Sequence, residues 1–291
     1  MKFACIQKLQ ATFPVQKMCA IFEVSSSGYY AFRKRKPSKR KKANENLVSE
    51  IKKIFQESRK TYGSPRMVHQ LRQNGVICSR NRVARLMRDN NLSVRRKRRK
   101  HPRTTQRAAG ALAAPNLLKQ KFTVREQNQI WVSDITYIDT RNGWLYLATT
   151  MDLFDRRIIG WTLENHMEAS LVKDAFQMAV AQRHPQKGLI HHSDQGSQYT
   201  SQLFRNALAE VGSHPSNSGV GNCYDNAPAE SFFSTLKFEC ANYQFPTWTE
   251  ARRKIFEYIE VWYNRKRLHS TLGYLSPTQF ALQNQTLIVS T

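Results

Sequence analysis

The chain of 291 residues is longer than one hydrophobic core usually organises, so we expect a main domain with smaller modules beside it. Its formal net charge of +25 is concentrated at one end: residues 1–120 contain 30 Lys and Arg against 5 Asp and Glu, whereas residues 121–291 contain 16 of each sign. This strongly basic half indicates a nucleic-acid partner, and no stretch approaches the roughly 20 apolar residues of a membrane-spanning helix or resembles a secretion signal at the start of the chain.

Residues 1–43 predict a small helical module followed by a basic arm. Apolar residues recur at helical spacing from Val15 to Phe22, and three serines offer a cap before residues 28–32, so we expect a short helical hairpin. The sequence RKRKPSKRKK at 33–42 has eight basic residues in ten. This charge density opposes independent folding and indicates a linker or an arm that embraces DNA. A tail that only adds solubility is the alternative.

Residues 44–103 predict a helix-turn-helix domain. The apolar face of its first helix comprises Leu47, Val48, Ile51, Ile54 and Phe55. Ser64 and Pro65 begin a second helix that ends at Gly75, and Ser79 caps a third helix. The third helix turns its apolar residues inward and leaves four arginines to meet a DNA groove or phosphates: Arg80, Arg82, Arg85 and Arg88. A solvated basic helix in a bundle would have the same pattern.

Basic residues continue beyond the third helix in the run RRKRRKHPR at 95–103. Candidate DNA contacts in this run are Arg95, Arg96, Lys97, Arg98 and Arg99. Residues 104–120 are rich in alanine and contain proline, which is typical of a linker.

Residues 121–285 predict an α/β domain. Strands are expected at 128–138, 144–151, 156–163 and 188–194, and helices at 169–183 and 201–211. The first strand alternates, with one face formed by Ile130, Val132, Asp134, Thr136 and Ile138. Three strands followed by alternating helix and strand favour a ribonuclease-H-like mixed sheet flanked by helices, with a C-terminal helix at the end.

Three acidic residues stand at positions where a carboxylate needs a compensating partner. Asp134 lies in the middle of an apolar strand, where burial of its charge is expensive. Asp194 ends the apolar strand GLIHHSD. Thirty-five residues separate Asp194 from Glu230, which lies within the first turn or so of a helix that begins near residues 225–228. A cation is the natural partner for such a set.

The same three carboxylates suit phosphoryl transfer at DNA. Two magnesium ions about 3.5 to 4 Å apart stabilise charge on both the entering and the leaving oxygen in an in-line displacement. Magnesium prefers a few carboxylates together with water and substrate oxygens, without sulfur or imidazole. The sequence therefore predicts a site for two Mg²⁺ ions, with unrelated turn and cap acids as the alternative.

Hairpin geometry argues against other acids as ligands. If the first turn centres near Arg141, Asp134 lies opposite Ala148, and Asp152 lies about four residues or on the order of 13 Å farther along. We therefore expect Asp152 and Asp155 to be turn residues. Asp139 belongs to the hairpin tip and is excluded on the same ground.

Three further residues are candidates near the carboxylates. Lys237 lies seven residues after Glu230, nearly two helical turns, so both side chains emerge on one face and the lysine can grip a phosphate. An ordinary solvated lysine is the alternative. Of His191 and His192, only one can point toward Asp194, because a strand alternates faces, and a catalytic role for either stays open.

Several sequence blocks resemble the second-frame transposases of the IS3 family of bacterial insertion sequences. The blocks are WVSDITYI, HHSDQGSQYTS, GNCYDNAPAESFFSTLKFE and YNRKRLHSTLGYLSP, and YGSPRMVHQLRQNGVICSRNRVARLM resembles the helix-turn-helix segment of that family. The resemblance covers nearly the whole chain. It implies an integrase-like fold, an acidic triad at Asp134, Asp194 and Glu230, and a helix lysine at Lys237. The loop HPSNSGVGNCYDN before the catalytic helix departs from the family pattern.

The resemblance also implies a reaction and partners. The expected activity is 3′-end cleavage and strand transfer with Mg²⁺ or Mn²⁺, in copy-out, paste-in transposition through a circular intermediate. The expected partners are double-stranded DNA at terminal inverted repeats and target, and further copies of the chain on DNA. An upstream-frame protein would add a coiled coil, since sustained leucine heptads do not occur here. A bacterial, cytoplasmic, nucleoid-associated location follows.

Three other functions compete with this interpretation. A nuclease of the same fold would hydrolyse DNA without joining it. A DNA-binding regulator would keep the fold without catalysis, against which the intact triad argues. An RNA partner is disfavoured, because the aromatic and glycine signatures of the usual RNA-binding modules do not occur in the sequence.

Overall fold

The computed structural model describes residues 2–36, 38–94, 114–219 and 223–289, and only the backbone of 223–224 and 285–289. Its N-terminal unit consists of α1 (Lys2–Leu9), α2 (Val15–Ile21) and α3 (Ser26–Lys34). These helices share a small core of Ile6, Met18, Cys19 and Tyr29. α2 and α3 confirm the predicted hairpin, and α1 adds a third wall to its core.

The predicted basic arm at 33–42 is divided between two helices. Arg33 and Lys34 end α3, and Lys39 begins α4 (Lys39–Glu57) after Ser38, whose Oγ accepts a hydrogen bond from the Lys41 backbone nitrogen at 3.2 Å. The expectation of a linker or free arm is wrong for residues 33–34 and 39–42, which belong to helices. Packing of the apolar stripe farther along α4 stabilises the helix. Its charged first turn becomes helical as well, because helix formation is cooperative.

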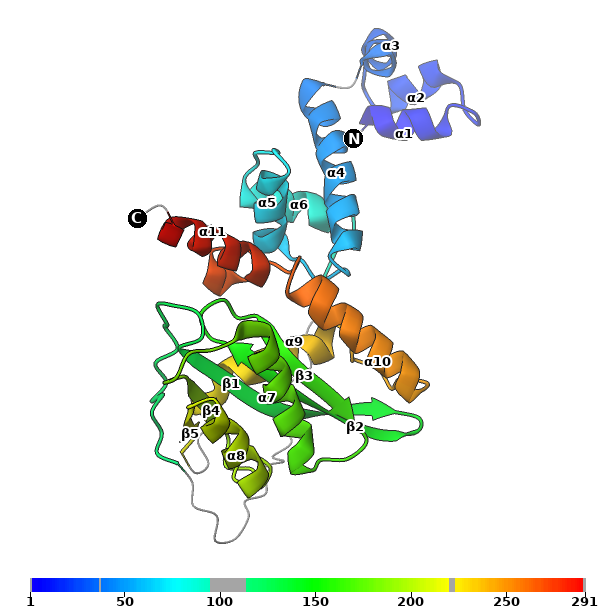
Figure 1. The fold of residues 1–291 in the computed structure, drawn as a ribbon. Helices are drawn as coiled ribbons and strands as arrows, with labels where there is room; N and C mark the ends of the chain where they lie inside the picture. Colours follow the sequence, from blue (N-terminus) through cyan, green and yellow to red (C-terminus); the bar gives the residue numbers. More distant parts are fainter. Residues whose placement is uncertain (1, 37, 95–113, 220–222, 290–291) are drawn as a thin grey trace.

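The helix-turn-helix domain has the predicted form. α4 packs with α5 (Ser64–Gln73) and α6 (Arg80–Asp89) around buried residues that include Ile51, Leu71 and Val83. Ser79 caps α6, since its Oγ accepts a hydrogen bond from the Arg82 backbone nitrogen at 3.3 Å. In Figure 1 the N-terminal unit lies at the end of α4 that is far from the sheet.

A five-stranded mixed sheet forms the centre of the larger domain. Its strands are β1 (Ile130–Thr140), β2 (Gly143–Asp152), β3 (Ile158–Glu164), β4 (Ile190–Ser193) and β5 (His214–Asn217), in the order β3-β2-β1-β4-β5. The first three are antiparallel, whereas β4 and β5 add in parallel to β1. The predicted ribonuclease-H-like arrangement of a mixed sheet flanked by helices is confirmed. β5 was not predicted, because the sequence HPSN has neither apolar alternation nor length.

Helices cover both faces of the sheet. α7 (Ala169–Arg183) and α8 (Gln202–Glu210) pack on the Trp131 face, and α9 (Ala227–Glu239), preceded by the short helix η1 (Cys223–Asn226), packs on the Val132 face. Gly160 permits the close approach of α7 to β3, because a Cβ there would lie 2.0 Å from the Ala175 backbone oxygen. Any side chain at this position would force the two layers apart.

The hairpin register differs by one residue from the predicted one. Asp134 pairs with Thr149, not Ala148, because the turn contains two residues between Thr140 and Gly143. A two-residue loop shifts every partner by one position relative to a turn centred on Arg141. Asp152 consequently pairs with Trp131, and its place beyond the candidate site does not change.

The C-terminal segment joins the two larger domains. It contains α10 (Trp248–Phe256), the π-helix η2 (Glu257–Tyr263), the short helix η3 (Ser270–Leu272) and α11 (Pro277–Val289). One continuous apolar cluster extends from α4–α6 through η2 to the sheet, for example through Met67, Tyr258 and Val132. Figure 1 shows α11 between the helix-turn-helix domain and the sheet, and α10 extending alongside the sheet on the side of β2 and β3. Among the described helices, none is both long enough and apolar enough to cross a membrane.

The described end of the predicted linker is part of the larger domain. The backbone nitrogens of Ala114 and Leu117 donate to Asn217 Oδ1 and Ser216 Oγ at 2.8 and 2.9 Å, and Leu118 is buried. Residues 114–118 therefore lie along the edge strand β5. The remainder of the linker and the candidate DNA contacts Arg95, Arg96, Lys97, Arg98 and Arg99 lie outside the described residues.

Candidate active site

The two predicted aspartates lie on neighbouring parallel strands at the centre of the sheet. β1 pairs with β4 so that Val132 lies opposite His192. Continuing this register by two residues places Asp134 beside Asp194, which directly follows β4. Both aspartates are half-buried. The parallel crossover thus brings together two acids that are distant in the sequence.

Glu230 approaches the same region from α9. Asn226, directly before the helix, donates from Nδ2 to the Ser133 backbone oxygen at 3.1 Å. This hydrogen bond fixes the start of α9 beside the residue that precedes Asp134. Glu230 lies in the first turn of the helix and is exposed. Asn226 is therefore a positioning residue that the sequence had indicated only as part of a helix start.

Asp194, Glu230 and Lys237 all lie close enough to Asp134 to act on its charge. Burial raises the pKa of Asp134 well above its ordinary range, and the charges of Asp194 and Glu230 raise it further. The Ile135 backbone nitrogen, which donates to Asp134 Oδ1 at 2.8 Å, and the charge of Lys237 act in the opposite direction. Desolvation lowers the pKa of Lys237, and Asp134 partly offsets this effect.

The donor set of this site consists of carboxylate oxygens. Among the residues that the structure describes, no three His, Cys, Asp or Glu side chains form a preassembled metal cage. Magnesium is commonly held by one or two carboxylates with water and substrate phosphates. A bound cation would stabilise the ionised form of Asp134, which burial and two like charges oppose. The residues therefore fit a hard divalent cation.

Asp194 is held by a turn that the sequence indicated only in outline. Its Oδ1 accepts a hydrogen bond from the Gly196 backbone nitrogen at 3.0 Å, and a Cβ at Gly196 would lie 3.0 Å from the same oxygen. Asn217 donates from Nδ2 to the Asp194 backbone oxygen at 2.9 Å. Because Asn217 Oδ1 also accepts a hydrogen bond from the Ala114 backbone nitrogen, the described end of the linker is connected to the backbone of Asp194.

His191 and His192 are buried on opposite faces and support the sheet. His191 Nε2 is hydrogen-bonded to Ser133 Oγ at 2.8 Å, and His192 Nδ1 to Ser216 Oγ at 2.8 Å. Burial, helped by its neighbour His192, lowers the pKa of His191 to about 3, and burial lowers the pKa of His192 to about 4. Both rings are therefore neutral near pH 7 and serve as hydrogen-bonding spacers between strands.

Tyr199 is a buried neighbour of the carboxylates that the sequence did not single out. Its hydroxyl has no hydrogen-bond partner among the described residues. Burial raises its pKa well above the ordinary value, and Asp134 and Asp194 raise it further. Its ring lies 5.5 Å from that of Phe204. The Tyr199 side chain therefore lines the candidate site on the side of Asp194.

The acids that the hairpin argument excluded as ligands have partners elsewhere. Asp152 was expected in a turn, but it still pairs with Trp131 and is therefore a strand residue. Asp152 ends β2 and accepts hydrogen bonds from the backbone nitrogens of Asn128 and Phe154 at 3.0 and 2.9 Å. Asp155 lies in the following turn and forms an ion pair with Arg183 at 2.6 Å. Asp139 lies near the hairpin end and is exposed.

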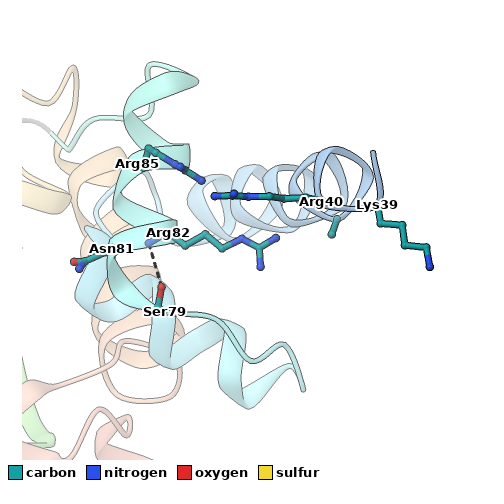
Figure 2. A pocket seen from close by; sticks show the side chains of 7 residues that line it. Lys39, Arg40, Ser79, Asn81, Arg82 and Arg85 are labelled. Carbon is teal, nitrogen blue, oxygen red and sulfur yellow. Dashed lines mark hydrogen bonds between the residues drawn. The ribbon is translucent and has the colours of Figure 1, made fainter. Parts of the chain in front are cut away.

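A basic groove separates α4 from α6 on the helix-turn-helix domain. Its volume is about 790 Å³, and its lining consists of Lys39, Arg40, Ala43, Ser79, Asn81, Arg82 and Arg85. Figure 2 shows the cationic side chains extending from both helices around this groove. Among the described residues of this lining there is no carboxylate. A phosphate backbone is the chemical complement of such a groove.

The four predicted arginines of α6 differ in their surroundings. Arg82 and Arg85 line the groove, whereas Arg80 and Arg88 are exposed outside it. Arg82 also donates from Nε and Nη2 to Asn44 Oδ1 at 3.0 and 2.8 Å, which orients its guanidinium along α4. The sequence did not predict that the first turn of α4 would contribute cations to the same groove.

Models of known protein families match three stretches of this chain. An HTH-like domain model matches residues 42–100, and integrase core domain models match residues 124–223 and 230–287. The transposase for insertion sequence element IS904 of Lactococcus lactis is 43% identical over 251 residues, which cover 86% of this chain and 99% of that protein. Transposase InsF for insertion sequence IS3A of Escherichia coli is 39% identical over 287 residues, with coverage of 98% and 99%.

Two further similarities were found. An uncharacterized 31 kDa protein of insertion element IS600 from Shigella sonnei is 44% identical over 264 residues, which cover 90% of this chain and 97% of that protein. Among solved structures, a chain of the simian T-cell lymphotropic virus intasome in complex with PP2A regulatory subunit B56 gamma aligns with a TM-score of 0.45 and 16% identity. That alignment covers 73% of this chain and 69% of the other.

Proposed function

This chain belongs to the IS3 family of insertion-sequence transposases, and from that premise we propose that it cleaves DNA 3′ ends and transfers the strands at Asp134, Asp194 and Glu230. The observation that carries the proposal is the parallel pairing of β1 and β4, which sets the two aspartates side by side with Glu230 in electrostatic range.

The three acidic residues would together bind two divalent ions in this proposal. Asp134 and Asp194 would hold both divalent ions, and Glu230 would complete the coordination of one. Two bound Mg²⁺ ions, or Mn²⁺ in their place, would stabilise charge on the entering and leaving oxygens of the phosphodiester. Lys237, on the same helix as Glu230 and electrostatically coupled to Asp134, would position a DNA phosphate.

The reaction proceeds in two displacements at one site. Water attacks the phosphorus at the end of the element, the bond from phosphorus to the 3′ oxygen breaks, and that oxygen takes a proton to become a 3′-hydroxyl. The hydroxyl then loses its proton and attacks a second phosphodiester, whose own 3′ oxygen leaves. One bond to phosphorus forms and one breaks in each step, so neither displacement needs an external energy source. We propose that these displacements serve copy-out, paste-in transposition through a circular intermediate.

Recruitment of DNA is assigned to the basic half of the chain. Residues 1–120 hold a net charge of +25, and the groove lined by Lys39, Arg40, Arg82 and Arg85 offers phosphates a cationic surface without carboxylates. We propose that terminal inverted repeats bind the helix-turn-helix domain, that several copies assemble on DNA, and that an upstream-frame protein joins this assembly. Residues 121–291 contain equal numbers of acidic and basic residues. The long-range attraction that brings the target strand to the catalytic half would therefore come from residues 1–120.

The test is an oligonucleotide assay with element ends, a target duplex and magnesium. Asp194→Asn should abolish both cleavage and joining and leave DNA affinity within about twofold, because the aspartate lies outside the helix-turn-helix domain. Asp139→Asn is the matched control, an exposed aspartate on β1 that accepts a hydrogen bond from Gln244, and should retain activity. Strand transfer by the Asp194→Asn variant would contradict the assignment. Cleavage by the wild type without joined products would identify a hydrolytic nuclease instead.

A further inference from the structure

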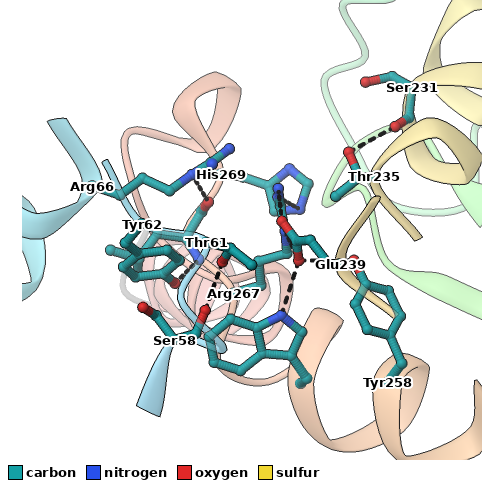
Figure 3. A network of polar contacts seen from close by, with 12 residues as sticks. Ser58, Thr61, Tyr62, Arg66, Ser231, Thr235, Glu239, Tyr258, Arg267 and His269 are labelled. Carbon is teal, nitrogen blue, oxygen red and sulfur yellow. Dashed lines mark hydrogen bonds and ion pairs between the residues drawn. The ribbon is translucent and has the colours of Figure 1, made fainter. Parts of the chain in front are cut away.

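The last residue of α9 is a buried acid that the proposed chemistry does not use. The Glu239 side chain is 2% exposed and forms an ion pair with Arg267, which is 5% exposed. Arg267 donates from Nη2 to Oε1 at 2.8 Å and from Nε to both oxygens at 3.0 Å. Tyr258 Oη and Trp262 Nε1 donate to Oε2 at 3.0 and 3.2 Å. We name these four residues the Glu239 clamp (Figure 3).

The clamp depends on an unusual helix. Tyr258 and Trp262 both lie on the π-helix η2, and the wide turn continues past it, since the Asn264 backbone nitrogen donates to the Ile259 oxygen at 3.0 Å. π-helical turns are rare and occur frequently at functional sites. Here the π-helix supplies two side-chain donors, four residues apart, to one carboxylate.

The helix-turn-helix domain forms hydrogen bonds with the backbone on both sides of Arg267. Tyr62 Oη accepts a hydrogen bond from the Leu268 backbone nitrogen at 2.8 Å and donates to the Lys266 backbone oxygen at 3.3 Å. Arg66 Nε donates to the Leu268 backbone oxygen at 3.0 Å. Tyr62, which begins the approach to α5, is fully buried in this contact. Three hydrogen bonds from the DNA-binding domain therefore fix the segment that holds Glu239.

α9 is consequently fixed at both ends by directional polar bonds. At its start, Asn226 donates a hydrogen bond to the backbone of β1 next to Asp134. At its end, Glu239 is held by Arg267 and the other residues of the Glu239 clamp. Glu230 and Glu239 are nine residues apart, a span of about 13.5 Å along a single rigid helix. A buried ion pair stabilises a fold little compared with apolar residues of the same shape, whereas it constrains geometry. The clamp therefore constrains the rotation and height of the helix that carries Glu230.

We propose that Glu239 and Arg267 are positioning residues for Glu230 and that Tyr62 and Arg66 make this positioning depend on the docking of the helix-turn-helix domain. The role of Glu230 in this inference rests on the proposed function. DNA bound to the basic domain would thus act on the catalytic helix through residues 266–268. This coupling acts through the packed helix and its hydrogen bonds, so its effect is measurable without metal or DNA.

The experiment compares hydrogen exchange of α9 in the metal-free full-length chain. Tyr62→Phe keeps the ring and removes the hydroxyl that joins residues 266–268. The substitution removes both hydrogen bonds of this hydroxyl, and the loss of even one of typical strength should accelerate exchange at residues 227–239 by about five- to tenfold. Arg267→Lys keeps the charge but loses the planar fork and should do the same. Glu257→Gln is the matched control, because it weakens another ion pair between the same two domains, Arg59 with Glu257 at 2.7 Å, without touching Glu239.

DNA cleavage supplies the second readout. Tyr62→Phe should lower kcat by about tenfold and leave KM for DNA within about twofold. The Glu257→Gln control should cleave DNA as the wild type does. Faster exchange confined to residues near 62 and 266–268, with α9 unchanged, would overturn the proposal. If Tyr62→Phe does not fold, Arg66→Met carries the same comparison. If the wild type cuts no DNA, the proposed function fails, while the exchange measurement still decides the coupling.

Discussion

Asp134→Asn should stabilise the metal-free protein while it abolishes activity. The wild-type carboxylate is opposed by burial and by the charges of Asp194 and Glu230. Asparagine has nearly the same shape, and its oxygen can still accept the hydrogen bond from the Ile135 backbone nitrogen. The substitution therefore removes an unfavourable charge and retains the favourable contact. Most substitutions in a folded domain are destabilising, so a gain in stability is a specific expectation.

The pH dependence follows from the direction of the pKa shift. Asp134 has a folded-state pKa above its unfolded-state pKa, so its contribution to stability is fully present below the unfolded value and is lost as the pH rises through the folded one. The advantage of Asp134→Asn should therefore be smallest in acid and should grow as the pH approaches neutrality. Thermal unfolding of both proteins at several pH values, in chelator, measures this difference.

Stabilisation by bound metal sets the expected size of the change in Tm. A ligand at 100 times its Kd stabilises the folded state by about 2.7 kcal/mol. For a domain of 150–250 residues, 1 kcal/mol shifts Tm by roughly 2–4 °C, so saturating magnesium should raise the wild-type Tm by about 5–10 °C. Asp134→Asn removes a carboxylate that would hold both ions and should lose most of this increase.

The exposed Asp139→Asn control should respond to magnesium as the wild type does, because its carboxylate bonds Gln244 at the hairpin end. Two results would refute the reasoning about Asp134. The first is a lower Tm for Asp134→Asn than for the wild type in chelator at neutral pH. The second is an equal increase in Tm on adding magnesium to both proteins.

Three further predictions follow from the fold. Gly160→Ala should destabilise the protein by about 3 kcal/mol or more, because the new methyl would lie 2.0 Å from the Ala175 oxygen; urea unfolding measures this, and a loss under 1 kcal/mol would contradict it. Arg85→Ala should weaken binding of all DNA sequences alike and reduce the salt slope by about 1, as titrations at several salt concentrations would establish. His191 and His192 have pKa values lowered to about 3 and about 4, mainly by burial, so their NMR shifts should stay constant from pH 6 to 8; a midpoint near 6.5 in either would exclude this burial.

Much of the molecule is readable from local patterns. The alternation around Asp134 predicted which face it occupies, and the observed cores place Val132 and Trp131 on the two expected sides. α7 covers Ala169–Arg183, as its pattern predicted, and Ser79 caps α6. Such features depend on neighbours within a turn or a strand, so a short stretch of sequence contains the whole cause.

Other features arise only when distant segments meet. The short polar strand β5 becomes a strand because β4 pairs with it, and the charged start of α4 is helical because the apolar stripe beyond it is buried. The register of the β1–β2 hairpin depended on whether its turn contained one residue more or less. The alternation of apolar and polar residues does not specify this, because each strand has the same period of two in either register.

The sequence by itself determined the candidate carboxylates, since an acid inside an apolar strand is costly wherever that strand lies. Only the tertiary structure decided what holds them in place. Tyr62 and Leu268 are 206 positions apart, and Glu239 and Arg267 are 28 apart, and neither pair has a local signal. Hydrogen bonds and ion pairs of this kind depend on geometry within a few ångströms, which exists only after the helices and the sheet have packed.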